Sequence, residues 1–245
     1  MNGSSVLFLI SKRLFDIVVS LLVTIFLLSW LLPILAILIK LDSKGPVFFC
    51  QKRIGAYGKP FYCIKLRSMV ENAMANVEQA GANDPRITRF GKFLRYSYLD
   101  ELPQFINVLN GDMSIVGPRP HMINDCLSFL QVIPDYNLRH TMKPGITGMA
   151  QIKGYRGKVN TYFDVTHRFK LDMFYIKKAN FLLDLKIFLA TIAQLLFSIN
   201  KLYQSQLSIK VEVQAPKPAQ MAKPAVKKVA APVYQKITPP ERQSA

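Results

Sequence analysis

The sequence is poor in cysteine and lacks a nucleotide-binding glycine loop. Its three cysteines, Cys50, Cys63 and Cys126, lie far apart, and none belongs to a C-x-x-C pair. A disulfide framework or a zinc site is therefore not expected, and this usage favours a reducing environment that faces the cytoplasm. The pattern G-x-x-x-x-G-K-[ST] is also missing, which argues against a P-loop phosphotransferase that uses ATP.

Acidic residues are scarce as well. The chain of 245 residues has 15 Asp and Glu against 32 Lys and Arg, a formal net charge of +17. Such an excess predicts an anionic partner, and composition alone leaves nucleic acid, a membrane surface and a phosphorylated small molecule open. Half of the residues are hydrophobic, and the length suits one ordinary domain with appendages.

Charge is absent altogether from residues 17–39. This run of 23 residues lies between Asp16 and Lys40, and about 20 apolar residues are enough for a helix to cross a bilayer. The run is too long for a signal peptide, and no A-x-A-like cleavage site follows it. We interpret it as a membrane segment; the alternative is a helix buried in a protein core.

The membrane segment does not carry a signal for its orientation. Basic residues flank both of its ends, so both ends are stable on the cytoplasmic side. These residues are Lys12, Arg13, Lys40 and Lys44. Pro33 cannot donate a hydrogen bond to the carbonyl of Ser29, which predicts a break in the helix at these residues. We interpret residues 12–41 as a re-entrant helical hairpin, with a single spanning helix as the alternative.

Beyond residue 42 the patterns predict an α+β fold, a helix-rich compact domain with a short β-hairpin. Two strand-like runs around a glycine-containing turn place the hairpin at about 46–69. A helix ends at Gly111, and KPGITG at 143–148 is typical of a turn. Further helical patterns cover 70–80, 121–143, 162–178 and 181–203. We assign 42–206 to a cytosolic catalytic domain.

The last helix and the tail have distinctive compositions. A narrow polar stripe follows one face of residues 181–203, while nearly everything else there is apolar. Its members are Thr191, Gln194, Ser198 and Lys201. Packing in a core and lying in a membrane interface both fit this pattern. Residues 207–245 are rich in Pro, Lys and Ala, and we expect a disordered tail, either a solvated linker or a segment attracted to anionic lipid.

An adjacent acidic pair is the main candidate for chemistry. Asp100 and Glu101 precede Pro103, which is best tolerated in the first turn of a helix. The helix N-terminus would keep Asp100 ionised and attract phosphate, so Asp100 could act as a nucleophile. Glu101, together with Asp100, could hold Mg²⁺ beside substrate phosphates. The alternative is purely structural: a helix cap and a first-turn acid.

Basic residues in the surrounding motifs suggest a diphosphate-sized anion. Lys65 and Arg67 alternate on the second predicted strand and so share a face. Arg119 lies between two prolines in VGPRP, and guanidinium groups bind phosphate at two points. The others are Arg86, Arg89, Lys92 and Arg95. His121 and His140 are candidates for hydrogen bonding or proton transfer, although a single histidine is more often structural.

The ordered motifs resemble a known family. KRLFD, GPVFFCQKRIG, KLRSM, DPRITRFGKFLR, YLDELPQFINVLNGDMSIVGPRP and KPGITGMAQIKGYRG are similar to the bacterial sugar transferases, the monotopic phosphoglycosyl transferases. The resemblance runs from about Lys12 to Leu196. VGPRPH, with the later RH, KPGITG and GYRG, is most similar to the subgroup that transfers glucose 1-phosphate or galactose 1-phosphate to undecaprenyl phosphate.

The resemblance implies a two-step reaction with Mg²⁺ as the metal. Asp100 would attack the sugar-linked phosphate of a UDP-sugar and release UMP. Undecaprenyl phosphate would then take the phosphosugar, which starts the assembly of an exopolysaccharide, capsule, O-antigen or glycoprotein glycan. The implied substrate-binding residues are Lys65, Arg67, Arg86, Arg95, Arg119, His121, Arg156 and Asp172. The implied location is the bacterial inner membrane with the catalytic domain facing the cytoplasm; lipids of that membrane are expected partners and nucleic acid is not.

The sequence departs from the family pattern in its membrane segment. The family's re-entrant helix is usually broken at a Ser-Pro pair, whereas here three residues separate Ser29 from Pro33. Glucose-transferring relatives often have further membrane helices ahead of this region; with eleven residues before Lys12, none is expected in this sequence. The rival function is a non-catalytic, membrane-anchored basic domain that binds nucleic acid or acidic lipid, which would leave the acidic pair unexplained.

Overall fold

The computed structural model describes residues 6–72, 79–81, 84–159 and 161–214, with the part beyond Phe197 described by its backbone alone. Contacts divide the chain into one unit of Met1–Ser205 and another of Gln206–Ala245. The candidate site lies wholly within the first unit. Most of the predicted tail, residues 215–245, falls outside the described residues.

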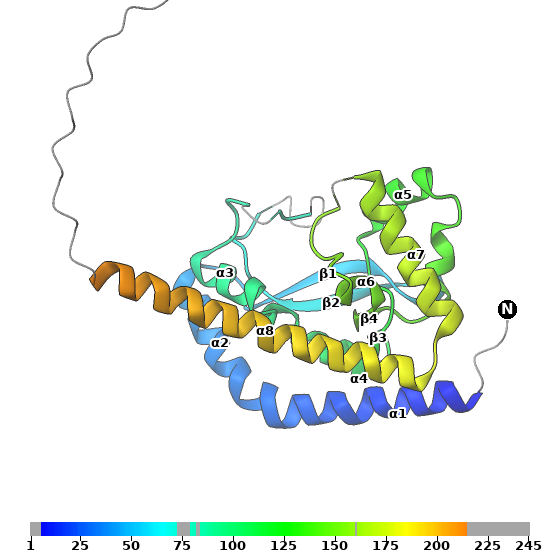
Figure 1. The fold of residues 1–245 in the computed structure, drawn as a ribbon, viewed down its shortest axis with the longest axis horizontal. Coiled ribbons are helices and arrows are strands. Elements are labelled where there is room, and N and C mark those ends of the chain that lie inside the picture. The colour runs from blue at the N-terminus through cyan, green and yellow to red at the C-terminus, as the bar shows by residue number, and fades with distance from the viewer. Residues whose placement is uncertain (1–5, 73–78, 82–83, 160, 215–245) are drawn as a thin grey trace, which may run out of the picture. The chain divides into compact units, whose positions relative to one another are not determined.

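The N-terminal segment is helical but irregular. Helix α1 (Val6–Val23) continues into a π-helix, η1 (Thr24–Leu28), and then into α2 (Ser29–Asp42). The ribbon changes direction between α1 and α2 (Figure 1). The stretch Val6–Asp42 is long and apolar enough to cross a membrane.

The helical irregularity lies one turn before Pro33, which is inside α2. A π-helix leaves carbonyl groups without their usual partners, and side chains bond two of them. The hydroxyl of Ser29 donates to the carbonyl of Ile25 at 2.5 Å, and the indole of Trp30 donates to that of Phe26 at 2.8 Å. Such pairing is what a helix break needs in an apolar environment.

Two small sheets form the centre of the fold. Strands β1 (Phe48–Ile54) and β2 (Pro60–Leu66) are antiparallel, with Phe49 opposite Lys65 and a 3₁₀ turn, η2 (Ala56–Gly58), at the tip. The predicted hairpin is confirmed. Strands β3 (Ser114–Val116) and β4 (Gly145–Thr147) pair in parallel.

Strand β4 corrects the prediction that KPGITG is only a turn. The strand has only three residues and begins with the glycine of a Pro-Gly pair, which is a turn signal, so the sequence pattern did not predict it. Gly145 faces Gly117, and a Cβ atom on Gly145 would overlap the backbone of Gly117. The glycines therefore permit an approach of two backbones that no other residue type would allow.

Helices surround the sheets. The first ones are α3 (Arg89–Tyr96), the 3₁₀ turn η4 (Leu99–Glu101), α4 (Gln104–Asn110) and α5 (Ile123–Val132). The 3₁₀ helix η5 (Tyr136–Thr141), α6 (Met149–Ile152), α7 (Tyr162–Lys178) and α8 (Phe181–Gln214) follow. Helix α4 ends at Gly111 with φ 88°, as predicted, and α8 continues past its predicted end at 203.

One predicted helix is not supported where it can be checked. The expected segment 70–80 is not helical at 70–72 or 79–81, and residues 73–78 lie outside the described part of the chain. The main core joins side chains from six elements, among them Met149 of α6. It contains Cys63 of β2, Val108 of α4, Ile115 of β3, Tyr175 of α7 and Ile187 of α8.

Helices α1 and α8 turn several polar side chains toward the protein, together with apolar ones such as Phe8 and Ile187. The buried residues of α1 are Phe8, Lys12, Asp16 and Ser20, which recur every four residues on one face. On α8, Thr191 bonds Thr147 at 2.6 Å, and Gln194 bonds the carbonyl of Ile152 at 2.8 Å. The first two residues of the predicted polar stripe therefore face the protein, and the side chains of Ser198 and Lys201 lie outside the described part.

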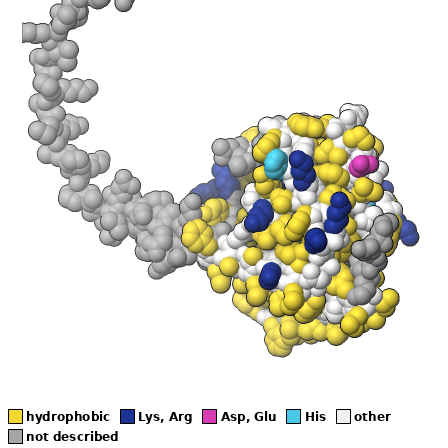
Figure 2. Space-filling model, turned by 45° about the vertical axis from the view of Figure 1, so that its right-hand side comes forward, with side chains coloured by type: hydrophobic (Ala, Val, Ile, Leu, Met, Phe, Trp, Pro, Cys, Tyr) yellow, Lys and Arg dark blue, Asp and Glu magenta, His cyan; other side chains and the backbone are white. Residues whose placement is uncertain are grey.

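The outward faces of these helices are apolar over the part whose side chains are described, up to Phe197. Exposed side chains include Leu14, Val18, Leu22, Phe26 and Trp30 in the first segment, and Leu189, Ile192, Leu196 and Phe197 on α8. Apolar side chains line the lower margin of the molecule in Figure 2, and basic side chains lie among apolar ones above it. An exposed apolar surface of this extent is typical of a membrane contact.

Candidate active site

The acidic pair lies on the one-turn helix η4. Tyr98 precedes it in the left-handed conformation (φ 58°), and Pro103 forms the N-cap of α4. Left-handed backbone is unfavourable for a residue with a side chain, so the surrounding contacts must hold this turn. The turn places Asp100 in a buried position, 8% exposed. Among the described residues, none makes a hydrogen bond or ion pair with the Asp100 carboxylate.

Glu101 is held by two cations. Its Oε1 accepts hydrogen bonds from Lys65 Nζ at 2.7 Å and Arg119 Nη2 at 2.5 Å, and its Oε2 accepts one from Arg119 Nη1 at 3.2 Å. Burial would raise the pKa of Glu101, but the charges of Arg119 and Lys65 hold it well below its usual range. Glu101 is therefore ionised throughout the physiological pH range.

Asp100 has the opposite shift. Burial raises its pKa to about 6, assisted by the negative charge of Glu101 and opposed by the positive charges of Lys65, Arg95 and Arg119. Burial thus works against the ionising effect expected of the helix N-terminus, because the loss of water outweighs the favourable charges. At neutral pH the group is still mostly ionised, and it is more basic than an ordinary aspartate.

Lys65 reaches the pair because the β2 strand is fixed against α4 by Asn107. The Asn107 side chain accepts a hydrogen bond from Ile64 N at 2.9 Å and donates to Tyr62 O at 2.8 Å. It is 1% exposed. An amide side chain can pair with both groups of a strand edge as a neighbouring strand would. Asn107 thus sets the position of Lys65 opposite Glu101.

Arg119 is supported from behind by a second buried group. Arg139 donates to the carbonyl of Arg119 at 2.7 Å and to Asp172 Oδ2 at 2.6 and 3.1 Å. It also contacts His121 Nδ1, which pairs with the hydroxyl of Tyr136. Burial and the charge of Arg139 hold the pKa of His121 well below its usual range, so its ring is neutral. Asp172 and His121 contact Arg139 and not Glu101, so they lie behind Arg119 as seen from the acidic pair.

Two other predicted residues have partners away from the acidic pair. Arg67 bonds the carbonyls of Lys44, Ser43 and Ile39, where it caps the C-terminal end of α2. Arg86 forms an ion pair with Asp84 at 2.7 Å. The structure thus brings together Asp100, Glu101, Lys65, Arg95 and Arg119. The substrate-binding roles of Arg67 and Arg86 stay predictions.

Arg156 lies near the pair through Tyr98. Its guanidinium is 4.9 Å from the centre of the Tyr98 ring and donates to Gln194 Oε1 at 2.7 Å. These residues line a cavity of about 510 Å³ together with Gln151 and Phe197. The cavity therefore lies between η4 and α8, next to the backbone that carries Asp100.

The donor set fits Mg²⁺. No group of three or more His, Cys, Asp or Glu side chains that could hold a metal occurs in the described residues, and the candidate site offers the two carboxylates of its acidic pair. The carboxylate of Asp100 makes no bond with a described residue, and Glu101 accepts three of about four possible hydrogen bonds. Mg²⁺ commonly takes one or two carboxylates and fills its shell with phosphate oxygens and water.

The sequence does not single out two buried residues that position parts of the candidate site, Asn107 and Arg139. Asn107 is inside a helical pattern, and nothing in the pattern distinguishes a surface amide from one that pairs with a strand. Arg139 belongs to the RH motif that was noticed, but the sequence does not show that its side chain reaches Arg119, His121 and Asp172 at once. A buried polar side chain among apolar neighbours is the only signal that could have pointed to either.

Comparisons with known proteins show the family of the chain. A profile of the bacterial sugar transferases matches residues 7–198, so the chain belongs to the bacterial sugar transferase family. The resemblance found in the motifs is confirmed.

Three relatives illustrate the match. The chain is 48% identical over 195 residues to the UDP-glucose:undecaprenyl-phosphate glucose-1-phosphate transferase of Klebsiella pneumoniae. The matched region covers 78% of this chain and 41% of that protein. It is 42% identical over 191 residues to the UDP-N-acetylgalactosamine-undecaprenyl-phosphate N-acetylgalactosaminephosphotransferase of Aeromonas hydrophila, covering 76% and 43%. It is 42% identical over 189 residues to the exopolysaccharide production protein PSS of Rhizobium leguminosarum bv. phaseoli, covering 75% and 94%. The chain thus spans about two fifths of the first two relatives and most of the third.

Proposed function

We propose that the chain is a phosphoglycosyl transferase that moves a sugar 1-phosphate from a UDP-sugar to undecaprenyl phosphate. One observation carries the proposal: Asp100, a buried carboxylate without a bonding partner among the described residues, lies beside a carboxylate that two cations hold in place. Both substrates appear in the names of relatives that act on different sugars. The motifs favour glucose or galactose as the sugar.

In the first step an oxygen of the Asp100 carboxylate attacks the sugar-linked phosphorus of the UDP-sugar. The bond between that phosphorus and the oxygen bridging to UMP breaks, and UMP leaves with the electron pair. The product is an acyl phosphate that joins Asp100 to the phosphosugar. Its pKa of about 6 makes Asp100 a stronger base than an ordinary aspartate and leaves it ionised at neutral pH.

In the second step an oxygen of undecaprenyl phosphate attacks the same phosphorus. The bond to the Asp100 carboxylate breaks, which restores the enzyme and gives undecaprenyl-diphosphate-sugar. Lys65, Arg95 and Arg119 surround the acidic pair and would bind the phosphate oxygens in both steps. Arg156, the one basic residue among those lining the 510 Å³ cavity, would bind the phosphate of the incoming lipid.

Glu101 and Asp100 would hold Mg²⁺ at this site. When bound, the metal neutralises charge on the diphosphate and on the departing UMP. Lys65 and Arg119 would orient the Glu101 carboxylate and leave one of its lone pairs for the metal.

The setting we propose is the inner face of the bacterial cytoplasmic membrane. Three features support it: the charge-free segment, the direction change between α1 and α2, and the apolar outward faces of α1 and α8. Segment 12–41 would enter the bilayer and return on the same side, as a re-entrant helix. The acidic pair would then lie close to the membrane surface, where the lipid acceptor presents its phosphate.

The test is turnover of a panel of UDP-sugars by the full chain in bilayer nanodiscs that contain undecaprenyl phosphate and Mg²⁺. We expect UMP release and undecaprenyl-diphosphate-sugar formation with one or few of the sugars. Absence of both with every UDP-sugar would overturn the proposal. Binding of nucleic acid or anionic vesicles without turnover would instead support the non-catalytic alternative.

A further inference from the structure

The KRLFD motif at the start of the membrane segment contacts both chain segments that form the candidate site. We call these segments, 99–111 with Glu101 and 114–119 with Arg119, the two arms of the site. We propose that Lys12, Arg13 and Asp16 are positioning residues, which fix the chain segment that carries Glu101 relative to the one that carries Arg119. The inference rests on the proposed function for its kinetic consequences, but its structural part does not depend on that function.

Arg13 holds the arm that begins with the acidic pair. Its Nη1 donates to Val108 O at 2.7 Å and its Nη2 donates to Leu109 O at 3.0 Å. Carbonyls in the last turn of a helix lack partners within the helix, and a cation there is favourable. Helix α4 has seven residues, so it is only about 10 Å long. Fixing its end therefore limits the movement of η4 at its other end.

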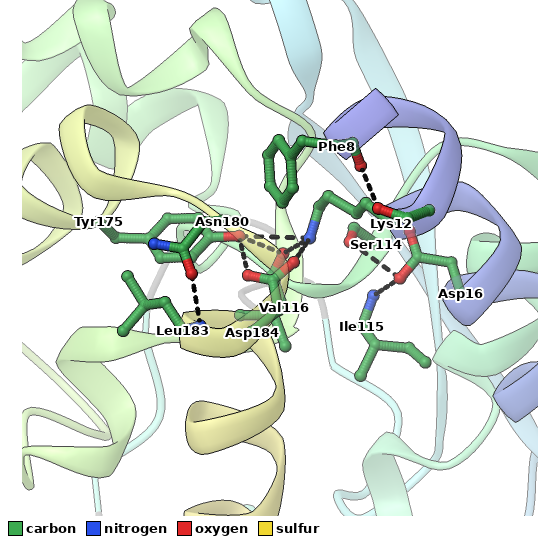
Figure 3. A network of polar contacts seen from close by, with 11 residues as sticks. Phe8, Lys12, Asp16, Ser114, Ile115, Val116, Tyr175, Asn180, Leu183 and Asp184 are labelled. Carbon is green, nitrogen blue, oxygen red and sulfur yellow. Dashed lines mark hydrogen bonds and ion pairs between the residues drawn. The ribbon is translucent and has the colours of Figure 1, made fainter. Parts of the chain in front are cut away.

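Asp16 and Lys12 hold the arm that leads to Arg119. Asp16 Oδ1 accepts hydrogen bonds from Ile115 N at 2.9 Å and Ser114 Oγ at 3.0 Å. Lys12 Nζ donates to Val116 O at 2.8 Å. Figure 3 shows these contacts between α1 and β3. Strand β3 ends three residues before Arg119, and its other edge is paired with β4.

Lys12 also connects this arm to α7 and α8. Its Nζ lies 2.7 Å from Asp184 Oδ2, and the hydroxyl of Tyr175 donates to Asp184 Oδ1 at 2.7 Å and to Val116 O at 3.2 Å. Lys12 is 7% exposed and Asp184 is 1% exposed. A buried ion pair contributes little net stability compared with apolar packing, but it demands one geometry. The group therefore specifies position more than it stabilises the fold.

The spacing of the motif explains how helix α1 can contact both α4 and β3. Residues four apart share a helix face, so Lys12 and Asp16 meet β3 together, while Arg13 points about 100° away toward α4. The two arms meet at the contact between Glu101 and Arg119. Displacement of reacting groups by about 1 Å can slow a reaction up to about 10²-fold, so loosening α1 should slow chemistry rather than weaken substrate binding.

The experiment measures single-turnover UMP release by the full chain in nanodiscs without lipid acceptor. Asp16→Asn and Arg13→Met should lower the rate constant at least tenfold, with the burst amplitude unchanged and the half-saturating UDP-sugar concentration within twofold. Arg13→Lys should recover part of the rate. Asp135→Asn is the matched control, because Asp135 is exposed and should release UMP at the wild-type rate. A lower amplitude at an unchanged rate constant would mean a structural role only and would overturn the inference.

A second background tests whether Asp16 acts through Arg119. In the Arg119→Lys protein, Asp16→Asn should slow UMP release much less than it does in the wild type, since the contact that it positions is already altered. The same factor in both backgrounds would overturn the inference.

Hydrogen exchange gives a readout that does not depend on activity. Amides in 99–111 and 114–119 should exchange faster in Asp16→Asn and Arg13→Met than in the wild type. Unchanged exchange in both segments would overturn the inference even if no UDP-sugar were turned over. If the wild type releases no UMP, the proposed function fails, whereas an active wild type with equally active variants contradicts the positioning role alone.

Discussion

The guanidinium of Arg119 meets the carboxylate of Glu101 at two points, 2.5 Å from Nη2 to Oε1 and 3.2 Å from Nη1 to Oε2. Lys65, on strand β2 of the hairpin, also donates a hydrogen bond to Oε1 of Glu101. Glu101 is therefore bound and ionised, whereas Asp100, its neighbour, makes no such bond with a described residue. Two adjacent carboxylates thus have different environments and can have different roles.

Arg119→Lys should slow UMP release by roughly 10- to 100-fold. Lysine keeps the charge but loses the two-point geometry, and a hydrogen bond to a charged group contributes about 1.5–3 kcal/mol. Steady-state kinetics with a UDP-sugar measure the effect. Lys170→Met, at an exposed position on α7, is the control. A rate within twofold of the wild type for Arg119→Lys would mean that the two-point contact between Arg119 and Glu101 has no part in catalysis.

The rate of the first step should depend on the ionisation of Asp100. Because its pKa is raised to about 6 and the carboxylate is the attacking form, UMP release should be constant above about pH 7 and fall about tenfold per unit below pH 6. The measurement omits the lipid acceptor, since a phosphate monoester also titrates near pH 6. A rate that stays constant down to pH 4.5 would contradict the assignment.

Asp100→Asn should stabilise the protein at neutral pH. A carboxyl group whose pKa is raised on folding binds more protons in the folded state between its unfolded value of about 4 and its folded value of about 6. Its contribution therefore becomes less favourable as pH rises through this window, and asparagine removes the penalty. Thermal melting should show a higher Tm for the variant at pH 7.5 and a smaller difference at pH 5. An equal difference at both values would mean that burial of the charge is not the cause.

Asn107→Leu should lower both stability and activity. Leucine has a similar size but leaves Ile64 N and Tyr62 O without the partners that Asn107 supplies, at a cost of roughly 2–4 kcal/mol. Denaturant melts and UMP-release assays below the transition measure the two effects. Asn110→Leu, exposed at the end of the same helix, should change neither by much. Wild-type activity in Asn107→Leu would show that the β2 strand needs no such support.

Local patterns predicted most of the fold. Alternation and turn residues indicated the hairpin of β1 and β2, and helical periodicity with a terminal glycine indicated α4 and Gly111. Contacts between distant segments carry no such local signal. The pairing of β3 with β4 joins Ser114 to Gly145 and Val116 to Thr147, and no pattern within three residues specifies a partner so far along the chain.

The candidate site could be predicted in part for the same reason. Asp100, Glu101 and Arg119 stand out in one continuous stretch of sequence, and Lys65 stands out on a strand. The sequence does not show that burial raises the pKa of Asp100, since the degree of burial depends on the whole fold. Nor does the sequence show that Arg67 caps α2, because an arginine near a motif looks the same in a sequence whether its side chain binds phosphate or the end of a helix.

The most direct test of the account is a search for the phosphosugar on Asp100. The full chain is incubated with Mg²⁺ and a UDP-sugar labelled in the sugar, without lipid acceptor, then denatured, digested and analysed by mass spectrometry. We predict UMP release in equal amount to label on the peptide that contains Asp100, transfer of that label on addition of undecaprenyl phosphate, and neither event in Asp100→Asn. Full turnover by Asp100→Asn with the lipid acceptor present would contradict the account.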